Sequence, residues 1–234
     1  MKWRFLGDEP TTLMRKGAEA SIFLEEWHGR RVVMKTRLPK SYRVDSLDSS
    51  IRLARTLREA HLLHDSKRAG VPAPTVYQVM TDTCTIVMEY VEGPRLKEAL
   101  TKMRGPDLSS TCRLVGILIS RLHSRGIVHG DLTTSNMILR GGMKIFLIDF
   151  GLSDYSHELE ARGVDMLLMS RAFKSTHFSL HSTAFRAVVN GYRTIAGEHD
   201  TQLVLEKMRE IGKRGRYSER PRQGALSHIE QGEV

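Results

Sequence analysis

Three polar side chains, Asp131, Asn136 and Asp149, follow one another at a spacing that suits phosphoryl transfer. The first two lie in the segment HGDLTTSN at 129–136, and the third opens the triplet DFG at 149–151. Phosphoryl transfer needs an acid that orients the nucleophile, together with carboxylate or amide oxygens that hold Mg²⁺. We therefore predict that Asp131 orients the attacking hydroxyl or water and that Asn136 and Asp149 coordinate the metal.

Each of these two motifs also has a simpler explanation. HGD is compatible with a turn whose aspartate and glycine only cap structure, and DFG with a turn that ends a strand. Both motifs occur here in the order of a catalytic loop and a metal-binding turn, with two short apolar segments between them. This combination favours a site over two unrelated turns. We interpret His129 as a structural support of the loop rather than as a base.

A lysine and a glutamate in the first third of the chain complete the expected set. Lys35 lies near the end of the apolar segment VVMK, where its ammonium could reach nucleotide phosphates. Glu59 is the only acid between Asp48 and Asp65, and it is the best candidate partner for Lys35. Taken alone, each has an ordinary alternative, a solvated lysine and a surface ion pair. If the pair exists, a shift of the segment that carries Glu59 would break it.

Two further segments are candidates for nucleotide contacts. The turn after the first expected strand lies where kinases place a glycine-rich cover over the phosphates, although it lacks GxGxxG. Its predicted contacts are Arg15, Lys16, Gly17, Ala18, Glu19 and Ala20.

The segment MEYV is the second candidate, at the expected boundary between two lobes. Backbone groups of Glu89 and Val91 could bind adenine, and Met88 could guard the pocket. A buried strand end explains this segment equally well.

Hydrophobic periodicity indicates the elements that must position these residues. Three β-rich segments between residues 12 and 37 are joined by tight turns, the last at His28 and Gly29. A long amphipathic helix is predicted over 47–69, and Gly70 and Pro72 end it. The remaining expected strands are 76–80, 85–90, 137–140 and 144–148, and the last two are joined at Gly141 and Gly142. The remaining expected helices are 95–102, 108–125, about 158–175, 180–196 and 199–212.

This order of elements predicts an α+β fold of the minimal bilobal protein-kinase type. A small β-rich N-lobe with the long helix would span 1–92, and the breaker sequence Glu-Gly-Pro at 92–94 would lead into a mostly helical C-lobe at 93–216. The remaining tail, 217–234, is expected to lack long-range order. Residues 207–222 hold seven Lys or Arg against two Glu, with glycine and proline among them.

Composition limits the setting in which the protein works. The formal net charge of +9 favours polyanions such as RNA, although solvated Lys and Arg faces explain such a charge equally well. The only cysteines, Cys84 and Cys112, lie in apolar surroundings and are predicted to be buried thiols of a reducing compartment. Since no segment resembles a signal peptide or membrane span, we expect a soluble cytoplasmic protein, also nuclear in a eukaryote, with no membrane partner.

Two features distinguish this chain from protein kinases with peptide substrates. Gly130 occupies the place of the arginine that pairs with a phosphorylated activation loop, so control of that kind should be missing. No APE triplet follows DFG, and the link to the next helical pattern is short. The usual platform for a peptide substrate is therefore not expected.

The chain resembles the small atypical kinase of the KEOPS (EKC) complex, the PRPK family, over roughly residues 16–216. The combination of HGDLTTSN, DFGLS and the run KxRLPKxYR at 35–43 is specific to this family, whereas HGD with a downstream Asn also occurs in RIO kinases and aminoglycoside phosphotransferases. Further matches are KGAEA, Leu47-Asp48, Arg55, Glu59-Ala60, GVPAP, MEYVEG, VDMLLMSRAF and the RGR at 214–216.

The resemblance implies an ATP- and Mg²⁺-dependent Ser/Thr kinase that acts as an ATPase when paired with the threonylcarbamoyl transferase subunit, of the Kae/OSGEP type. With the other KEOPS/EKC subunits it would serve the formation of N6-threonylcarbamoyladenosine in tRNAs that read codons starting with A. By matching position, Asp131 is the catalytic aspartate, Lys35 the phosphate-binding lysine and Glu59 its partner. The metal ligands are Asn136 and Asp149, and the basic tail is expected to contact tRNA and partner subunits.

Two alternatives remain open at this point. A small-molecule phosphotransferase of the aminoglycoside type shares HGD but should have an acidic pocket for a cationic substrate, against the basic excess of this chain. A non-catalytic scaffold of the same complex would tolerate the reduced glycine turn, whereas the complete polar set argues against degeneration.

Overall fold

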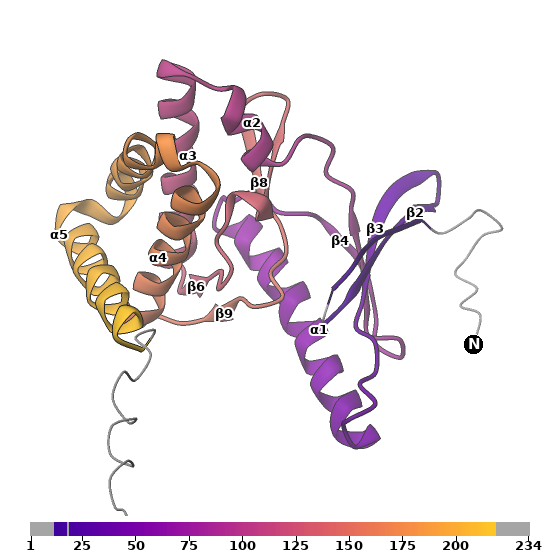
Figure 1. The fold of residues 1–234 in the computed structure, drawn as a ribbon. Helices are drawn as coiled ribbons and strands as arrows, with labels where there is room; N and C mark the ends of the chain where they lie inside the picture. The colour runs from indigo at the N-terminus through magenta and orange to yellow at the C-terminus, as the bar shows by residue number, and fades with distance from the viewer. Residues whose placement is uncertain (1–11, 18, 219–234) are drawn as a thin grey trace, which may run out of the picture.

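A five-stranded antiparallel sheet and one long helix form the N-lobe (Figure 1). The computed structural model describes residues 12–17 and 19–218. Along the sheet the strands follow the order β1, β2, β3, β5, β4. Their bounds are β1 (Thr12–Lys16), β2 (Ser21–Trp27), β3 (Arg30–Thr36), β4 (Val76–Met80) and β5 (Thr85–Glu89).

The turn between β2 and β3 explains how this sheet starts. Trp27 pairs with Arg30, so His28 and Gly29 form a two-residue hairpin loop. Both have positive φ angles, 49° and 72°, which matches the twist of the adjoining strands. The predicted turn at His28 and Gly29 is thereby confirmed. The turn fixes the register of β3, and Lys35 is the next-to-last residue of that strand.

The long helix α1 (Asp45–Arg68) begins two residues before the predicted start and ends one residue before the predicted end. Its first turn is acidic and its last turn is basic, as the helix dipole favours. Gly70, with φ of 75°, ends the helical pattern. The face that packs on the rest of the protein buries Leu62 and Leu63, and also Glu59.

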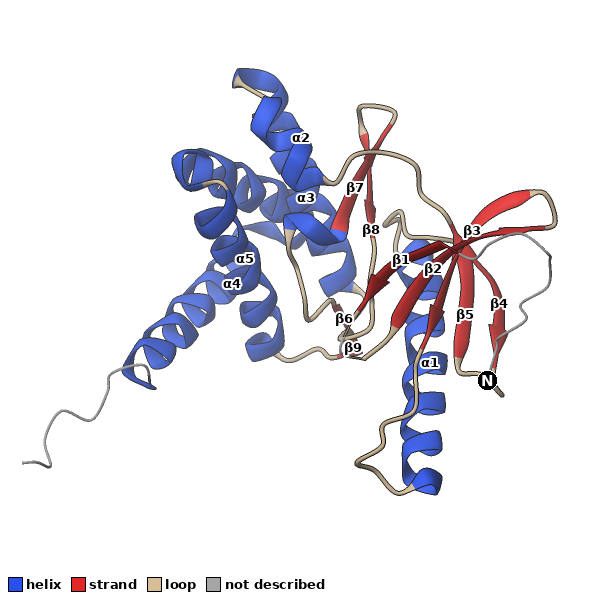
Figure 2. Cartoon of the chain, turned by 45° about the vertical axis from the view of Figure 1, so that its right-hand side comes forward, coloured by secondary structure: helices blue, strands red, loops and turns tan. Residues whose placement is uncertain are grey.

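The C-lobe is built on α3 (Gly105–Ser124), α4 (Leu159–Thr176) and α5 (His181–Ser218), with the short helix α2 (Leu96–Lys102) at its edge (Figure 2). Between α3 and α4 lie two small antiparallel pairs. These are β6 (Ile127–Val128) with β9 (Asp154–Tyr155), and β7 (Met137–Arg140) with β8 (Lys144–Leu147), preceded by the 3₁₀ turn η1 (Thr134–Asn136); a second 3₁₀ turn, η2 (Phe178–Leu180), precedes α5. Their backbone presents the residues of the HGD and DFG motifs.

Two lobes with this content confirm the predicted α+β fold of the minimal kinase type, and two differences in detail are informative. The pair β6 and β9 was not expected, because strands of two residues leave no periodic signal. The second C-lobe helix starts at Gly105 rather than 108. The two helices predicted over 180–196 and 199–212 are both present within α5, which is broken at Gly197, whose φ of 80° is not helical.

The basic segment near the end of the chain is more regular than expected where the structure describes it. Helix α5 continues to Ser218, so much of the basic segment 207–222 is helical rather than irregular. Residues 219–234, on which the rest of that expectation falls, lie outside the described part of the chain.

The two cysteines are free and buried, as predicted. Within residues 12–17 and 19–218, no helix combines the length and apolar character needed to cross a membrane.

Helices α3 and α5 approach each other through two glycines. A Cβ atom on Gly116 would lie 1.8 Å from the carbonyl oxygen of Val188, and one on Gly191 would lie 1.8 Å from that of Arg113. The contact is reciprocal, because each helix offers a glycine to the backbone of the other. No side chain fits at either position without moving the helices apart.

We expect Gly116→Ala to lower the free energy of unfolding by about 1–3 kcal/mol, because the methyl group forces α3 away from α5. Chemical denaturation measures this loss. The matched control is Gly212→Ala in α5, where the nearest atom to a new Cβ is 3.6 Å away. Higher helix propensity should make that variant neutral or more stable by up to about 1 kcal/mol. Equal stability of the Gly116→Ala and wild-type proteins would contradict the expectation.

Candidate active site

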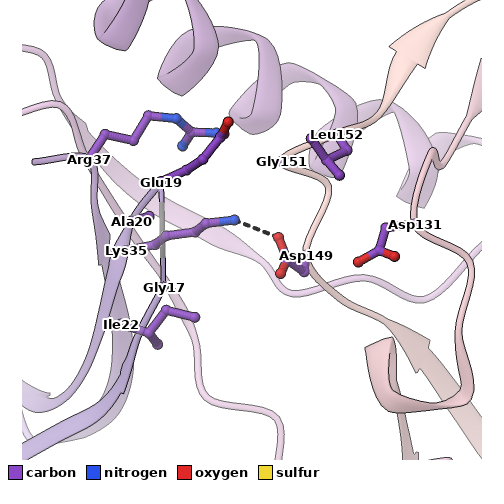
Figure 3. A pocket seen from close by; sticks show the side chains of 10 residues that line it. All are labelled: Gly17, Glu19, Ala20, Ile22, Lys35, Arg37, Asp131, Asp149, Gly151 and Leu152. Carbon is purple, nitrogen blue, oxygen red and sulfur yellow. Dashed lines mark hydrogen bonds and ion pairs between the residues drawn. The ribbon is translucent and has the colours of Figure 1, made fainter. Parts of the chain in front are cut away.

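A cleft of about 270 Å³ opens between the lobes, with residues of the first β-turn on one side and the HGD and DFG segments on the other (Figure 3). The N-lobe contributes Gly17, Glu19, Ala20, Ile22, Lys35 and Arg37, and the C-lobe contributes Asp131, Asp149, Gly151 and Leu152. Residues more than a hundred positions apart in the sequence therefore meet here.

Lys35 is the centre of the cleft's ionic network. Its Nζ lies 2.6 Å from Oε1 of Glu59 and 2.6 Å from Oδ1 of Asp149. The predicted pair of Lys35 and Glu59 is thus present, and Lys35 also joins the two lobes through Asp149. Figure 3 shows the contact with Asp149 as a dashed line.

Arg37 is a member of this network that the sequence interpretation missed. Its Nη1 donates to Oε2 of Glu59 at 2.8 Å, and its side chain is 3% exposed. Residues two apart on a strand point to the same face, so the spacing of Lys35 and Arg37 was an available signal. Glu59, itself 1% exposed, therefore balances two buried cations with its two oxygens.

The charges of the network stabilise one another. Burial by itself would lower the pKa of Lys35, but the carboxylates of Glu59 and Asp149 offset that effect and raise it. Burial would likewise raise the pKa of Asp149, whereas the ammonium of Lys35 holds it below its ordinary value. Both groups therefore stay charged near neutral pH.

Asp149 adopts an unusual backbone conformation for an aspartate, with φ of 63°. Positive φ costs a side chain of this kind energy, and such residues concentrate at functional sites. The conformation places the carboxylate beside Lys35 with a third of its side-chain surface exposed. It therefore remains accessible to a cation from the cleft.

Asp131 and Asn136 hold each other in place. The Nδ2 atom of Asn136 donates to Oδ2 of Asp131 at 2.7 Å and to its backbone oxygen at 3.0 Å. The carbonyl oxygen of the Asn136 side chain is left for another partner. This oxygen and the carboxylate of Asp149 are oxygen ligands of the kind that Mg²⁺ prefers. Among the described residues, no cluster of three or more His, Cys, Asp or Glu side chains occurs.

Asp165, on α4, fixes the backbone of the HGD turn from behind. Its carboxylate accepts hydrogen bonds from the backbone amides of His129 at 2.7 Å and Gly130 at 2.8 Å. It also contacts Nε2 of His123, whose Nδ1 lies 2.9 Å from the hydroxyl of Tyr192 on α5. The position of the HGD turn thus depends on a polar network inside the helical lobe, which local sequence motifs do not reveal.

The backbone geometry gives a second reason for a glycine at position 130, besides the missing control by a phosphorylated loop that was inferred from the sequence. Its φ is 75°, and a Cβ atom there would lie 2.2 Å from the carbonyl oxygen of Leu152. The HGD turn and the residues after DFG therefore touch through backbone. An arginine at this position would require a different path for one of the two segments.

His129 is fully buried and makes structural contacts, as predicted. Its Nε2 lies 3.2 Å from the carbonyl oxygen of Ile148, its own carbonyl accepts the hydroxyl of Ser153 at 2.7 Å, and its ring packs on Phe150. Burial lowers its pKa despite the nearby carboxylates of Asp165 and Asp149.

A pH dependence of stability follows from this lowered pKa. The unfolded chain, in which a histidine titrates near 6.5, takes up the proton more readily than the folded chain, so the free energy of unfolding should fall as the pH drops below about 6.5. His129→Asn should reduce the slope of this fall by up to about 1.4 kcal/mol per pH unit. Urea denaturation between about pH 7 and pH 5 measures both slopes, and identical slopes would exclude His129 as the group.

An apolar pocket of about 110 Å³ adjoins the polar cleft and shares Lys35 and Asp149 with it. Met88, Glu89 and Val91 line it, together with side chains of both lobes such as Val33 and Ile148. The backbone amide of Glu89 is already bonded to the carbonyl oxygen of Thr75, at 2.8 Å. Because this amide is already bonded, the backbone groups that remain as predicted contacts of adenine are the carbonyl of Glu89 and the backbone of Val91.

The remaining predicted contacts lie on or beside the first turn. Gly17 closes it by donating its amide to the carbonyl oxygen of Ala20 at 2.9 Å, and Glu19 and Ala20 line the cleft. Arg15 and Lys16 belong to β1, and Ala18 lies outside the described residues. Lys16 is not among the residues that line the polar cleft or the apolar pocket.

Comparison with known proteins gives the family. The model of the ABC1 atypical kinase-like domain matches residues 53–177. A protein of Pyrococcus abyssi named KEOPS complex subunit Bud32 is 47% identical over 214 residues, which cover 89% of this chain and 97% of that protein. The chain belongs to the Bud32 family.

Other relatives of the chain are longer. Proteins named probable bifunctional tRNA threonylcarbamoyladenosine biosynthesis protein are 41% identical in Methanothermobacter thermautotrophicus and 42% identical in Methanosarcina acetivorans. The alignments cover 90% and 92% of this chain but 37% of each relative. In these relatives a Bud32-like region is therefore joined to a larger additional part. The resemblance predicted from the sequence motifs is confirmed.

Proposed function

We propose that this chain binds ATP with Mg²⁺ and acts as an atypical Ser/Thr kinase and partner-dependent ATPase, within a KEOPS complex that makes threonylcarbamoyladenosine in tRNA. The observation that carries the proposal is the polar network of the cleft. Lys35, held by Glu59 and Asp149, stands opposite the pair of Asp131 and Asn136. The names of its relatives supply the biological setting.

The cleft and the apolar pocket suit the two ends of ATP. The apolar pocket beside Met88 would take the adenine, and the ammonium of Lys35 would contact phosphate oxygens in the polar cleft. Asn136 and Asp149 would hold Mg²⁺, which offsets negative charge on the phosphates. Exposure of a third of the Asp149 side chain supports this role, because a fully buried carboxylate could not reach the ion.

Asp131 would orient the nucleophile. Its Oδ2 is occupied by the amide of Asn136, so its other carboxylate oxygen is the one that can accept a proton from a hydroxyl or a water. Asn136 thereby orients the Asp131 carboxylate, and Asp165 holds the backbone of the loop that carries Asp131.

The segment after DFG supports a substrate other than an extended peptide. Only residues 152–158 separate Gly151 from α4, and part of this link is the strand β9, paired with β6. A platform for a peptide needs a longer ordered loop. Water or a partner-held hydroxyl group is therefore the better candidate for the acceptor.

The end of α5 and the residues beyond it are the proposed contact with tRNA. Within the described part, Arg209 and Lys213 are exposed, whereas Lys207 and Arg214 form ion pairs with Glu160 and Glu210. The exposed pair supports an electrostatic contribution to RNA binding.

ATP hydrolysis with and without the threonylcarbamoyl transferase subunit tests the proposal. We expect the partner to stimulate hydrolysis by the wild-type chain, and Asp149→Ala to abolish the stimulated activity. Asp82→Ala is the matched control, because Asp82 lies exposed in the turn between β4 and β5. Absence of stimulation would refute the partner-dependent ATPase, and phosphate transfer to a small hydroxyl compound without any partner would favour the phosphotransferase instead.

A further inference from the structure

A second polar pocket, of about 230 Å³, adjoins the phosphate end of the cleft and shares Glu19 and Arg37 with it. Its lining is dominated by cations: Arg37, Lys40, Arg43, Arg52 and Arg55. Lys40 and Arg43 belong to the run KxRLPKxYR, which the proposed nucleotide site does not use beyond Lys35 and Arg37. The pocket therefore gathers the part of this motif that still lacks a function.

Partly buried contacts hold several of these cations in place. Asp48, at the start of α1, accepts from Nε of Arg52 at 2.6 Å and lies 3.4 Å from Nη1 of Arg43. Arg52 also donates to the carbonyl oxygen of Arg37 at 3.3 Å. The connection from β3 to α1 and the first turns of α1 are thereby tied together. The guanidinium groups are ordered before any ligand arrives.

The carboxylates present do not balance the cations. Three carboxylates, of Glu19, Asp48 and Glu59, contact the four guanidinium groups of the pocket, and Glu59 also contacts Lys35. The contact of Arg55 with Glu19 is exposed on both sides, so it contributes little. The guanidinium groups therefore outnumber the carboxylates that contact them.

Arg37 gives an independent sign of a missing acceptor. Its side chain is 3% exposed, and its Nε is buried without a hydrogen-bond partner among the described residues. Buried donors of this kind are nearly always bonded. Because Arg37 lines the pocket, a negatively charged group placed there would lie beside a donor that is already desolvated.

We propose that this pocket binds a phosphate dianion, as inorganic phosphate or as a terminal phosphate monoester, next to the nucleotide site. Guanidinium groups match phosphate oxygens through paired hydrogen bonds, and a phosphate monoester carries a charge of about −1.5 to −2 at pH 7, which the cations of the pocket attract strongly. A single carboxylate or a phosphodiester carries only half of it. Apart from Glu19 and Arg37, which line both the pocket and the cleft, the residues of this site are not proposed contacts of ATP, so phosphate binding here is measured without reference to the ATPase activity.

An NMR titration of the full chain with inorganic phosphate tests the site. We expect the backbone amide signals of residues 38 and 40–43 to shift. The double variant Lys40→Gln/Arg55→Gln should bind roughly tenfold more weakly, because each lost charge-assisted hydrogen bond weakens the complex. The matched control is Lys67→Gln/Arg68→Gln, which makes the same charge change near the other end of α1 and should stay within about twofold of the wild type.

A short single-stranded RNA, with and without a 5′-phosphate, distinguishes the sources of the phosphate. Preference for the phosphorylated RNA over inorganic phosphate would identify a terminal monoester, and the reverse would identify the free ion; both support the site. Equal binding of the two RNAs with no effect of inorganic phosphate would overturn it in favour of a general polyanion surface. An equal loss of binding in both double variants, or no shift at 38–43, would also overturn it.

Discussion

Asp131→Asn is expected to lower partner-stimulated ATP turnover by about 10²- to 10⁴-fold, the range that a positioned acid or base contributes. Asparagine keeps the size of the side chain and can still face the amide of Asn136, so the loop should keep its shape. Binding of ATP should therefore change little, because Lys35 and Asp149 keep their contacts. Steady-state hydrolysis and equilibrium nucleotide binding, measured on the same preparation, separate the two effects.

Asp82→Asn is the control for this substitution, since it makes the same chemical change at an exposed turn. A second readout is modified adenosine in tRNA from cells that carry Asp131→Asn. Full modification by this variant would contradict a catalytic role and would support a scaffold that holds tRNA and neighbouring subunits. Loss of both nucleotide binding and turnover would point to a misplaced loop instead.

Glu59→Ala is expected to cause the largest loss of stability, about 3–5 kcal/mol, because it removes the carboxylate that contacts buried Arg37 and leaves buried Lys35 with Asp149 alone. Lys35 and Arg37 are 7% and 3% exposed at the side chain, and each loses a carboxylate oxygen at 2.6 and 2.8 Å. Chemical denaturation of the isolated chain measures the change.

Two comparisons make this result specific. Glu59→Gln keeps the shape and one acceptor, and it should fall between the wild type and Glu59→Ala. Glu206→Ala removes an exposed glutamate of α5 and should stay within about 0.5 kcal/mol of the wild type. A Glu59→Ala protein as stable as the Glu206→Ala protein would show that water reaches the two cations.

The parts of the site that could be predicted are those encoded in short stretches of sequence. Asp131, Asn136 and Asp149 follow from motifs in which residue type and spacing suffice. The pairing of Lys35 with Glu59 followed from a scarcity of acids in one predicted helix, and the structure contains it. The functional roles of these residues remain predictions for the experiments above.

The parts that were missed depend on contacts between distant segments. In the sequence, Asp165 is only an acid within an apolar helical segment. Its hydrogen bonds become visible only once α4 packs behind the HGD turn. The unpartnered Nε of Arg37 likewise follows from tertiary burial.

The link after DFG is tied to α1 by exposed polar contacts as well as by Lys35. Arg58 lies 3.3 Å from Asp154, and the hydroxyl of Tyr155 donates to Asp65 at 2.6 Å. Any opening of the cleft that swings α1 away from the C-lobe must break both. Salt screens an exposed ion pair, so the rate at which spent nucleotide leaves should rise with ionic strength. The replacement of spent nucleotide by ATP between turnovers would then depend on the ionic strength of the solution as much as on the rate of the chemical step.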